Sequence, residues 1–195
     1  MHKGSYYIIT GITIYRLVAA PVLMILIFTG NIVLFSCLLP ISFFSDFIDG
    51  YLARKFKVTS IIGTKLDSIG DDLTVLAALV GLFVLKSEFV KEEKIFFLTL
   101  LALYVFQNIA AYIRYHKMTG FHTYVAKAAA ILQGVFLILI FILPKPIYIL
   151  FYSAAVATAI DLVEEIILVF LLPKWEANVK GIYWVVKKNP NQKHK

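Results

Sequence analysis

Five aspartates fall within one short stretch, residues 45–73, of a chain that otherwise carries few charges. Asp46 and Asp49 are three positions apart, and Asp67 and Asp71 are four positions apart. On a helix, residues at these separations share one face, so each segment is expected to present a pair of carboxylates. Asp72 lies outside this spacing, and we expect it to support its neighbours or helix packing.

The residues between the two pairs, 54–62, are basic and polar, and they allow the flanking helices to pack as antiparallel neighbours. Four carboxylates would then converge and repel one another unless divalent cations bind between them. Hard oxygen ligands favour magnesium, manganese or calcium over zinc. The pattern therefore predicts a metal site, with Mg²⁺ as the first choice.

Small and cationic residues accompany the acidic pairs. Gly50 and Ala53 share the helix face of the first pair, and Gly63 opens the second segment. In a membrane bundle, small residues let helices approach closely; beside a metal site, they also admit a phosphate or a flat group against the backbone. The cations that could bind a pyrophosphate here are Arg54, Lys55, Lys57 and Lys65.

The elements that position these residues are apolar helices. The chain has 195 residues, of which 61% are hydrophobic and 16% charged, a composition typical of a membrane protein. We predict an all-α integral membrane bundle of six transmembrane helices. The expected spans are Tyr7–Phe28, Ile32–Leu52, Gly63–Leu85, Ile95–Ile113, Tyr124–Leu143 and Ile147–Leu172.

Basic residues decide the expected orientation. With six crossings, 15 of the 19 lysines and arginines fall on the side of the two termini, so the positive-inside rule places both termini in the cytoplasm. The net charge of +7 is thus explained by topology, and no nucleic-acid partner is expected. We predict a single domain over residues 1–195, in which 173–195 form a basic tail that lies in the headgroup layer or merely solubilises the chain.

The acidic stretch resembles a known signature. Its spacing is similar, without a gap, to that of the CDP-alcohol phosphotransferase family of phospholipid-synthesising membrane enzymes, at Asp46, Asp49, Gly50, Ala53, Arg54, Gly63, Asp67 and Asp71. The resemblance implies a six-helix enzyme, often a homodimer, whose active site faces the cytoplasm in a bacterial or archaeal cell membrane. It also implies two divalent ions, Mg²⁺ or Mn²⁺, that hold the pyrophosphate of a CDP-linked donor, commonly CDP-diacylglycerol.

Roles for single residues follow from the resemblance. The metal ligands become Asp46, Asp49, Asp67 and Asp71, and Asp71 becomes the general base that accepts a proton from the alcohol. Donor binding falls to Asp49, Gly50, Ala53, Arg54, Gly63 and Asp67. The implied reaction moves a phosphatidyl group from CDP-diacylglycerol to a small alcohol and releases CMP.

The acceptor is predicted from weaker signals. Thr13, Arg16 and Pro21 keep a spacing similar to that of the phosphatidylglycerophosphate synthase branch, although Thr10 stands where that branch usually has asparagine. Arg16 is either a ligand residue or an anchor whose side chain extends to the membrane surface. A phosphorylated polyol such as glycerol 3-phosphate is the preferred acceptor, and inositol phosphate, inositol and serine are alternatives. The acceptor phosphate is assigned to Lys65, Arg114, Lys117 and Lys127, a cluster that could instead be a topology signal or a contact for anionic lipid.

Three further acids lie in the last apolar segment. Asp161, Glu164 and Glu165 either make polar contacts, at a dimer interface or with lysines of a neighbouring helix, or line a water-filled ion path. Gln107 and Asn108 could supply hydrogen bonds to them, which favours the polar contacts. The competing function of a different class is accordingly a divalent-cation transporter. It is disfavoured because the aspartates lie at one end of their helices, whereas a permeation path needs polar residues through the full depth of the bilayer.

Overall fold

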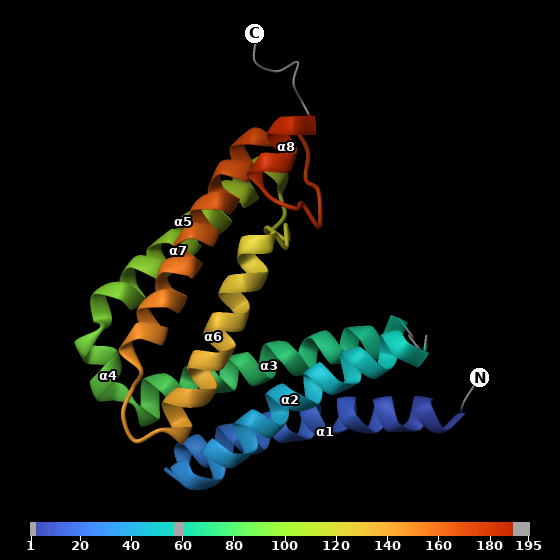
Figure 1. The fold of residues 1–195 in the computed structure, drawn as a ribbon, viewed down its shortest axis with the longest axis vertical. Helices are drawn as coiled ribbons and strands as arrows, with labels where there is room; N and C mark the ends of the chain where they lie inside the picture. The colour runs from blue at the N-terminus through green and yellow to red at the C-terminus, as the bar shows by residue number, and fades with distance from the viewer. Residues whose placement is uncertain (1–2, 57–60, 189–195) are drawn as a thin grey trace, which may run out of the picture. The chain divides into compact units, whose positions relative to one another are not determined.

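The structure, a computed structural model, describes residues 3–56 and 61–188, and their side chains except those of residues 3–10, 46–47, 49–56, 61–65, 67–68 and 188. Every regular element in these ranges is a helix (Figure 1). The helices are α1 (Lys3–Phe28), α2 (Ile32–Phe56), α3 (Ile61–Leu85), α4 (Ser87–Glu92), α5 (Lys94–Tyr115), α6 (Tyr124–Ile142), α7 (Tyr148–Leu171) and α8 (Ile182–Lys188). Each of the six predicted segments coincides with a long helix, and the predicted all-α class is confirmed. The short helices α4 and α8 were not predicted.

Three of the described helices contain stretches long and apolar enough to cross a membrane. They are Gly11–Phe28 within α1, and the whole of α5 and α6. Large apolar side chains are exposed on these helices, for example Ile25 of α1 and Ile113 of α5, which are 60% and 72% exposed. A soluble helix would bury such a face, whereas a lipid environment solvates it. The chain is a membrane protein.

The chain divides into two compact units, each with its own core. The first unit contains the chain up to Lys91 together with Leu137–Pro146, and hence α1, α2, α3 and the last turns of α6. The second contains Glu92–Phe136 and the chain from Ile147 onward, and hence α5, the beginning of α6, α7 and α8. The single-domain assignment stays a prediction.

A tight turn of three residues, 29–31, joins α1 to α2. Gly30 has a positive φ of 70°, and its N–H donates to the Ile27 carbonyl at 3.1 Å while Asn31 N–H donates to the Leu26 carbonyl at 3.0 Å. These bonds satisfy carbonyls that the end of α1 leaves unpaired. Asn31 then caps α2, because its Oδ1 accepts from Leu34 N–H at 3.2 Å. The two helices therefore run antiparallel.

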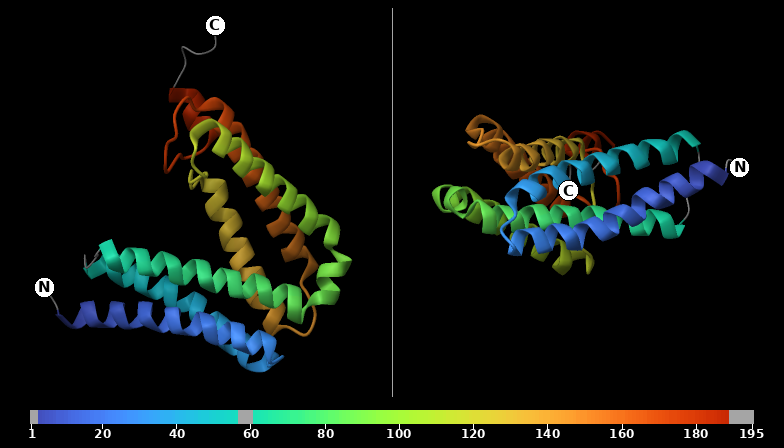
Figure 2. Two further views of the ribbon diagram at one scale, coloured as in Figure 1. Left: turned by 180° about the vertical axis from the view of Figure 1, so that it is seen from behind. Right: turned by 90° about the horizontal axis from the view of Figure 1, so that it is seen from below.

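The core of the first unit is where α1 packs against both α2 and α3. The three helices lie side by side in Figure 1 and in both views of Figure 2. Phe35 of α2 is fully buried, and its ring meets Phe141 of α6 edge to face at 4.7 Å between centroids. Ser36 Oγ also donates to the Phe141 carbonyl at 2.8 Å. These contacts fix α2 to the end of α6.

Gly81 of α3 is required by this packing. A Cβ at this position would lie 2.7 Å from Phe35 Cζ and 3.3 Å from Phe141 Cζ, closer than carbon atoms approach in packed interiors. The absent side chain thus lets α3 approach the aromatic pair.

The second unit is built on the contact between α5 and α7. At one end of the unit, Tyr152 Oη donates to Glu93 Oε1 at 2.8 Å, and Phe151 packs against Phe96, Phe97 and Phe136. At the other end, a hydrophobic cluster lies beneath the loops that follow α5 and α7. This cluster contains Ala111, Phe121, Leu168, Val169, Leu172 and Val179.

Replacing Gly81 by alanine should lower the free energy of unfolding in detergent by about 1–3 kcal/mol, because the added methyl group must displace Phe35. Denaturant titration followed by circular dichroism measures the change. The matched control is Gly134→Ala on α6, where a Cβ has nothing within 4 Å and the effect should be neutral or slightly stabilising. Equal stability of the two variants would contradict the packing described here.

Candidate functional site

The two halves of the aspartate signature lie on neighbouring helices. Asp46 and Asp49 belong to the last turns of α2, and Asp67 and Asp71 belong to the first turns of α3. The helices are in contact and lie side by side with opposite directions in Figures 1 and 2. The end of α2 therefore adjoins the start of α3, as the sequence predicted. Residues 57–60, which include Lys57, lie outside the described part of the chain.

Of the signature side chains, the structure describes only that of Asp71. Those of the other seven positions, together with Lys55 and Lys65, lie outside the described side chains, although their backbones are helical; the seven are Asp46, Asp49, Gly50, Ala53, Arg54, Gly63 and Asp67. The site is therefore built from Asp71 and its surroundings.

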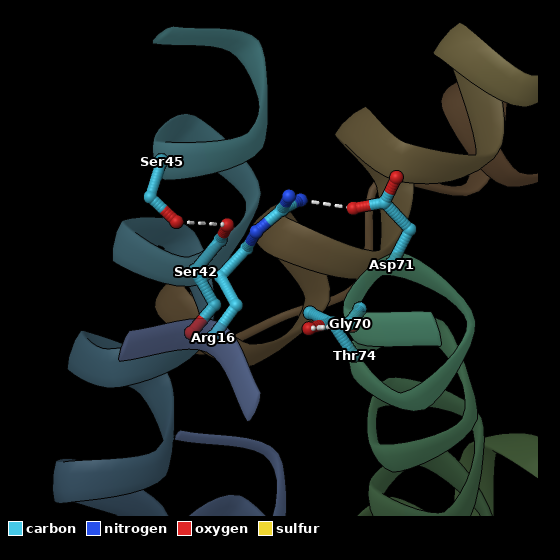
Figure 3. A network of polar contacts seen from close by, with 6 residues as sticks. All are labelled: Arg16, Ser42, Ser45, Gly70, Asp71 and Thr74. Carbon is cyan, nitrogen blue, oxygen red and sulfur yellow. Dashed lines mark hydrogen bonds and ion pairs between the residues drawn. The ribbon is translucent and has the colours of Figure 1, made fainter. Parts of the chain in front are cut away.

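Asp71 forms an ion pair with Arg16 of α1, through Oδ1 of the carboxylate and NH1 of the guanidinium. The two partners differ in exposure: the side chain of Arg16 is 1% exposed and that of Asp71 is 37% exposed. The cation is thus enclosed within the unit, while the carboxylate remains accessible. Figure 3 shows that the second carboxylate oxygen of Asp71 points away from the guanidinium.

Small residues on both neighbouring helices make room for Arg16. A Cβ on Gly70 would lie 3.4 Å from Arg16 Cβ and 3.9 Å from its Nε, so the arginine side chain runs against the bare backbone of α3. On the other side, Ser42 of α2 is fully buried. Figure 3 shows the arginine passing between these two helices toward Asp71.

The hydroxyl groups around Arg16 bond within their own helices. Thr74 Oγ1 donates to the Gly70 carbonyl at 2.8 Å, and Ser42 Oγ donates to the Leu38 carbonyl at 3.1 Å. Ser45 Oγ donates to the Ser42 carbonyl at 2.8 Å, one residue before Asp46. These hydroxyl groups therefore bond to backbone carbonyls, and among the described side chains Arg16 forms an ion pair with Asp71.

The burial of Arg16 corrects one of its two sequence interpretations. An anchor extending to the membrane surface would expose its guanidinium, whereas Arg16 is buried and paired with an acid 55 residues away. One signal in the sequence could have located the pair: an arginine inside an apolar helix needs a partner, and the acids of the signature are the natural choice. Gly70, which permits the approach, carried no sequence signal. Asp72 is exposed, so it is not packed within the first unit, and its expected support of the neighbouring acids stays a prediction.

The cations assigned to an acceptor phosphate, apart from Lys65, lie in the second unit and have other contacts there. Arg114 NH2 donates to the Leu172 carbonyl at 3.1 Å, at the end of α7. Lys117 Nζ lies over the Trp175 ring at 5.0 Å, and Lys127 Nζ lies over the Tyr124 ring at 5.5 Å. Their phosphate-binding role stays a prediction.

Two of the three acids of α7, Glu164 and Glu165, make polar contacts, as one of the two interpretations held. Gln107 of α5 donates through Nε2 to Glu165 Oε2, and the same amide donates to Thr119 Oγ1. Glu164 Oε1 accepts from Ile182 N–H at 3.1 Å. Asn108, the other candidate, bonds instead to the Tyr104 carbonyl at 2.9 Å and to Gln107. These contacts join α7 to α5 and to the start of α8.

The donor chemistry of the signature fits a hard divalent cation. The Asp71 carboxylate is accessible, and carboxylate oxygens are the ligands that magnesium and manganese prefer. Arg16 engages one oxygen of Asp71 and leaves the other directed away (Figure 3). The oxygen of Asp71 that points away from Arg16 can therefore bind a metal ion or accept a proton, while Arg16 fixes the position of the carboxylate.

Removing Asp71 should destabilise the protein more than removing Arg16. Asp71→Ala removes the described acidic partner of a buried guanidinium, whereas Arg16→Met leaves a carboxylate that water still reaches. Removing one partner of a buried ion pair, so that the other charge stays buried, lowers the free energy of unfolding by about 3–5 kcal/mol. We expect Arg16→Met to lower it by less. Chemical unfolding in detergent without divalent ions measures both.

The double variant, Arg16→Met with Asp71→Ala, provides the control. It should lose less stability than the sum of the single changes, because no charge is left stranded. The ion pair is refuted as described if the two effects simply add, or if Arg16→Met is the more damaging change.

Sequence similarity to known proteins covers most of the chain. Residues 8–170 match the sequence profile described as CDP-alcohol phosphatidyltransferase. A Rickettsia typhi protein named CDP-diacylglycerol--glycerol-3-phosphate 3-phosphatidyltransferase is 33% identical over 84 residues, which cover 42% of this chain and 46% of the relative. The Rickettsia prowazekii protein of the same name is also 33% identical over 84 residues, covering 42% and 45%.

A further relative is a fusion protein of Schizosaccharomyces pombe, named cardiolipin synthase (CMP-forming) / mitochondrial hydrolase fusion protein. It is 38% identical over 60 residues, which cover 31% of this chain and 10% of the relative. The chain spans about half the length of the Rickettsia relatives that it matches. No solved structure gives a significant match.

Proposed function

We propose, since the chain belongs to the CDP-alcohol phosphatidyltransferase family, that it transfers a phosphatidyl group from CDP-diacylglycerol to glycerol 3-phosphate and releases CMP. The observation that carries the proposal is the intact signature on two adjoining helices, with Asp71 accessible and fixed by a buried arginine. The choice of acceptor is supported by the names of the two Rickettsia relatives and by the Thr13, Arg16 and Pro21 spacing.

The cofactor in this proposal is a pair of Mg²⁺ ions, with Mn²⁺ as the alternative, held by Asp46, Asp49, Asp67 and Asp71. When bound, the ions supply neutralising charge for the pyrophosphate and stabilise CMP as the leaving group. Gly50, Ala53 and Gly63 provide space for the donor beside the backbone, and Arg54 contacts the nucleotide or its phosphates. Lys65, Arg114, Lys117 and Lys127 remain the candidates for binding the acceptor phosphate.

The reaction is a direct displacement. Asp71 accepts the proton of the acceptor hydroxyl, and the hydroxyl oxygen forms a bond to the phosphorus that carries diacylglycerol. The bond from that phosphorus to the bridging oxygen of the pyrophosphate breaks, and CMP leaves with the bridging oxygen. Arg16 holds one oxygen of Asp71, which orients the other toward its partner in the reaction.

The proposed setting is a bacterial or archaeal cell membrane, crossed six times, with both termini and the active site at the cytoplasmic side. Its support is the coincidence of six predicted segments with six long helices and the distribution of basic residues between the connections. A homodimer is the proposed assembly, on the strength of the family resemblance alone.

The first test is CMP release by the purified full chain in detergent with CDP-diacylglycerol and Mg²⁺. Glycerol 3-phosphate should support faster turnover than inositol phosphate, inositol or serine. A preference for serine or free inositol would refute the acceptor, and no CMP release with any acceptor would refute the reaction. Uptake of Mn²⁺ into sealed vesicles containing the protein would favour the cation transporter instead.

Asp71→Asn should lower the turnover number by about 10²–10⁴-fold, the range typical of losing a general base. Asp72→Asn is the matched control, because Asp72 is adjacent, exposed and outside the signature, and it should stay within a few-fold of the parent. The assignment of Asp71 fails if its variant keeps near-normal turnover, or if the two variants lose activity equally.

A further inference from the structure

At one end of the second unit, α5 ends, α6 begins, α7 ends and α8 follows (Figure 1). The sequence places many cations and aromatic rings in these segments. We call this region the basic–aromatic end. Its exposed cations are Arg114, Lys117, Lys127, Lys174, Lys180 and Lys187, and its exposed rings are Tyr124, Trp175, Tyr183 and Trp184. The two tryptophans are the only ones in the chain.

The end is an ordered surface, because the two loops that form it are bonded to each other. Trp175 Nε1 donates to the Met118 carbonyl at 3.0 Å, and Tyr124 N–H donates to the Lys180 carbonyl at 3.3 Å. Tyr115 Oη donates to the Leu172 carbonyl at 2.8 Å. Beneath these bonds lies the hydrophobic cluster around Phe121. The described part of the tail, up to residue 188, is thus bonded to the loop that follows α5.

The start of α8 is held by an acid of α7. Glu164 Oε1 accepts from Ile182 N–H at 3.1 Å, and a Cβ on Gly181 would lie only 2.9 Å from the same oxygen. Gly181 has a φ of 144°, a conformation that side chains rarely permit. Trp184 packs against Tyr124 at 5.3 Å between ring centroids. The rings of α8 are therefore fixed relative to α6.

The rings and the cations are interleaved. Lys117 Nζ lies 5.0 Å from the Trp175 ring, Lys127 Nζ lies 5.5 Å from the Tyr124 ring, and Lys187 Nζ lies 5.9 Å from the Tyr183 ring. Tryptophan and tyrosine favour the headgroup depth of a bilayer, where the ring meets lipid and the polar edge meets water. Lysines at the same depth reach lipid phosphates. The arrangement suits the surface of a membrane better than bulk water.

The two ends of the second unit differ in charge. Against its exposed cations, the basic–aromatic end has one exposed carboxylate, Glu176, among the described residues. At the opposite end, Glu92 and Glu93 accept hydrogen bonds from Tyr148 and Tyr152, and Lys94 begins α5. The strong positive charge is therefore confined to one end of the unit and complements an anionic partner.

We propose that the basic–aromatic end is a docking surface for the headgroups of anionic phospholipids in the bilayer. The lysines bind lipid phosphates, and the four rings set the depth of the surface in the headgroup layer. Three cations of this surface, Arg114, Lys117 and Lys127, are also candidates for binding the acceptor phosphate, so the test below changes only its other lysines, Lys174, Lys180 and Lys187. The proposal also provides a role for the part of the chain beyond residue 170, where the family match ends.

The intrinsic tryptophans make the test direct, because both lie on this surface. The full chain is reconstituted into vesicles of phosphatidylcholine with a fixed minor fraction of phosphatidylglycerol, and bromine is placed on the phosphatidylglycerol or on an equal amount of the phosphatidylcholine. Overall lipid composition and charge are then identical. Brominated phosphatidylglycerol should quench tryptophan fluorescence about two- to threefold more strongly, and high salt should remove most of the difference.

Three variants, two of them neutralised to the same net charge, separate this surface from a general effect of positive charge. Neutralising Lys174, Lys180 and Lys187 to glutamine should bring the quenching ratio close to one, and changing them to arginine should preserve it. Neutralising Lys86, Lys91 and Lys94 to glutamine, at the connection between α3 and α5, should leave the ratio unchanged. Helical circular dichroism verifies that each variant is folded.

Three outcomes would overturn the proposal. Equal quenching by the two brominated lipids would mean that the rings are in the headgroup layer without a preference for anionic lipid. Absence of quenching by either lipid would place the surface away from the bilayer. A preference that survives neutralisation of Lys174, Lys180 and Lys187 would mean that other groups recognise the lipid.

Discussion

A charge enclosed among apolar helices requires a partner, and the pair of Arg16 and Asp71 meets this requirement in the first unit. The arginine is 1% exposed and comes from α1, whereas the aspartate is 37% exposed and comes from α3. Because the enclosed member is a cation, the acid that satisfies it is held at the edge of the helices, where it remains accessible. The pair therefore links the packing of the unit to the chemistry of the signature.

Much of the first unit follows from this constraint. Gly70 presents bare backbone to the arginine, and Ser42 offers little bulk on the facing helix, so α1 can lie against both α2 and α3. Further along the same helices, Gly81 allows α3 to approach Phe35 and Phe141. Close approach at both places keeps α2 and α3 adjacent. Adjacency of these two helices is what the carboxylate pairs need to act on one ligand.

The types and spacing of the residues correctly predicted the long helices and the enzyme family. The long apolar segments coincide with α1, α2, α3, α5, α6 and α7, because an apolar run about 20 residues long has few other solutions in a membrane. The signature led to the family that the profile match shows. Hydrogen bonding between Gln107 and Glu165 was also anticipated, since an acid within an apolar helix needs a donor.

What the sequence could not supply were contacts between distant segments. Arg16 and Asp71 are 55 positions apart, and nothing local in either helix selects one partner over another. The ordered tail has the same cause, because Trp175 and Lys180 are positioned by bonds to Met118 and Tyr124, which belong to another loop. The helix α4 was not predicted, because its sequence is short and charged and only one of its side chains, that of Phe89, is buried.

The central claim is that acids of α2 and α3 share bound divalent cations, with Asp71 among the ligands. Electron paramagnetic resonance of the purified chain titrated with Mn²⁺ tests it directly, without any turnover. The account predicts two ions per chain with the magnetic coupling of neighbours about 3.5–4 Å apart, and loss of that coupling in Asp71→Asn. Isolated, uncoupled Mn²⁺, or a coupled signal that Asp71→Asn leaves unchanged, would contradict it.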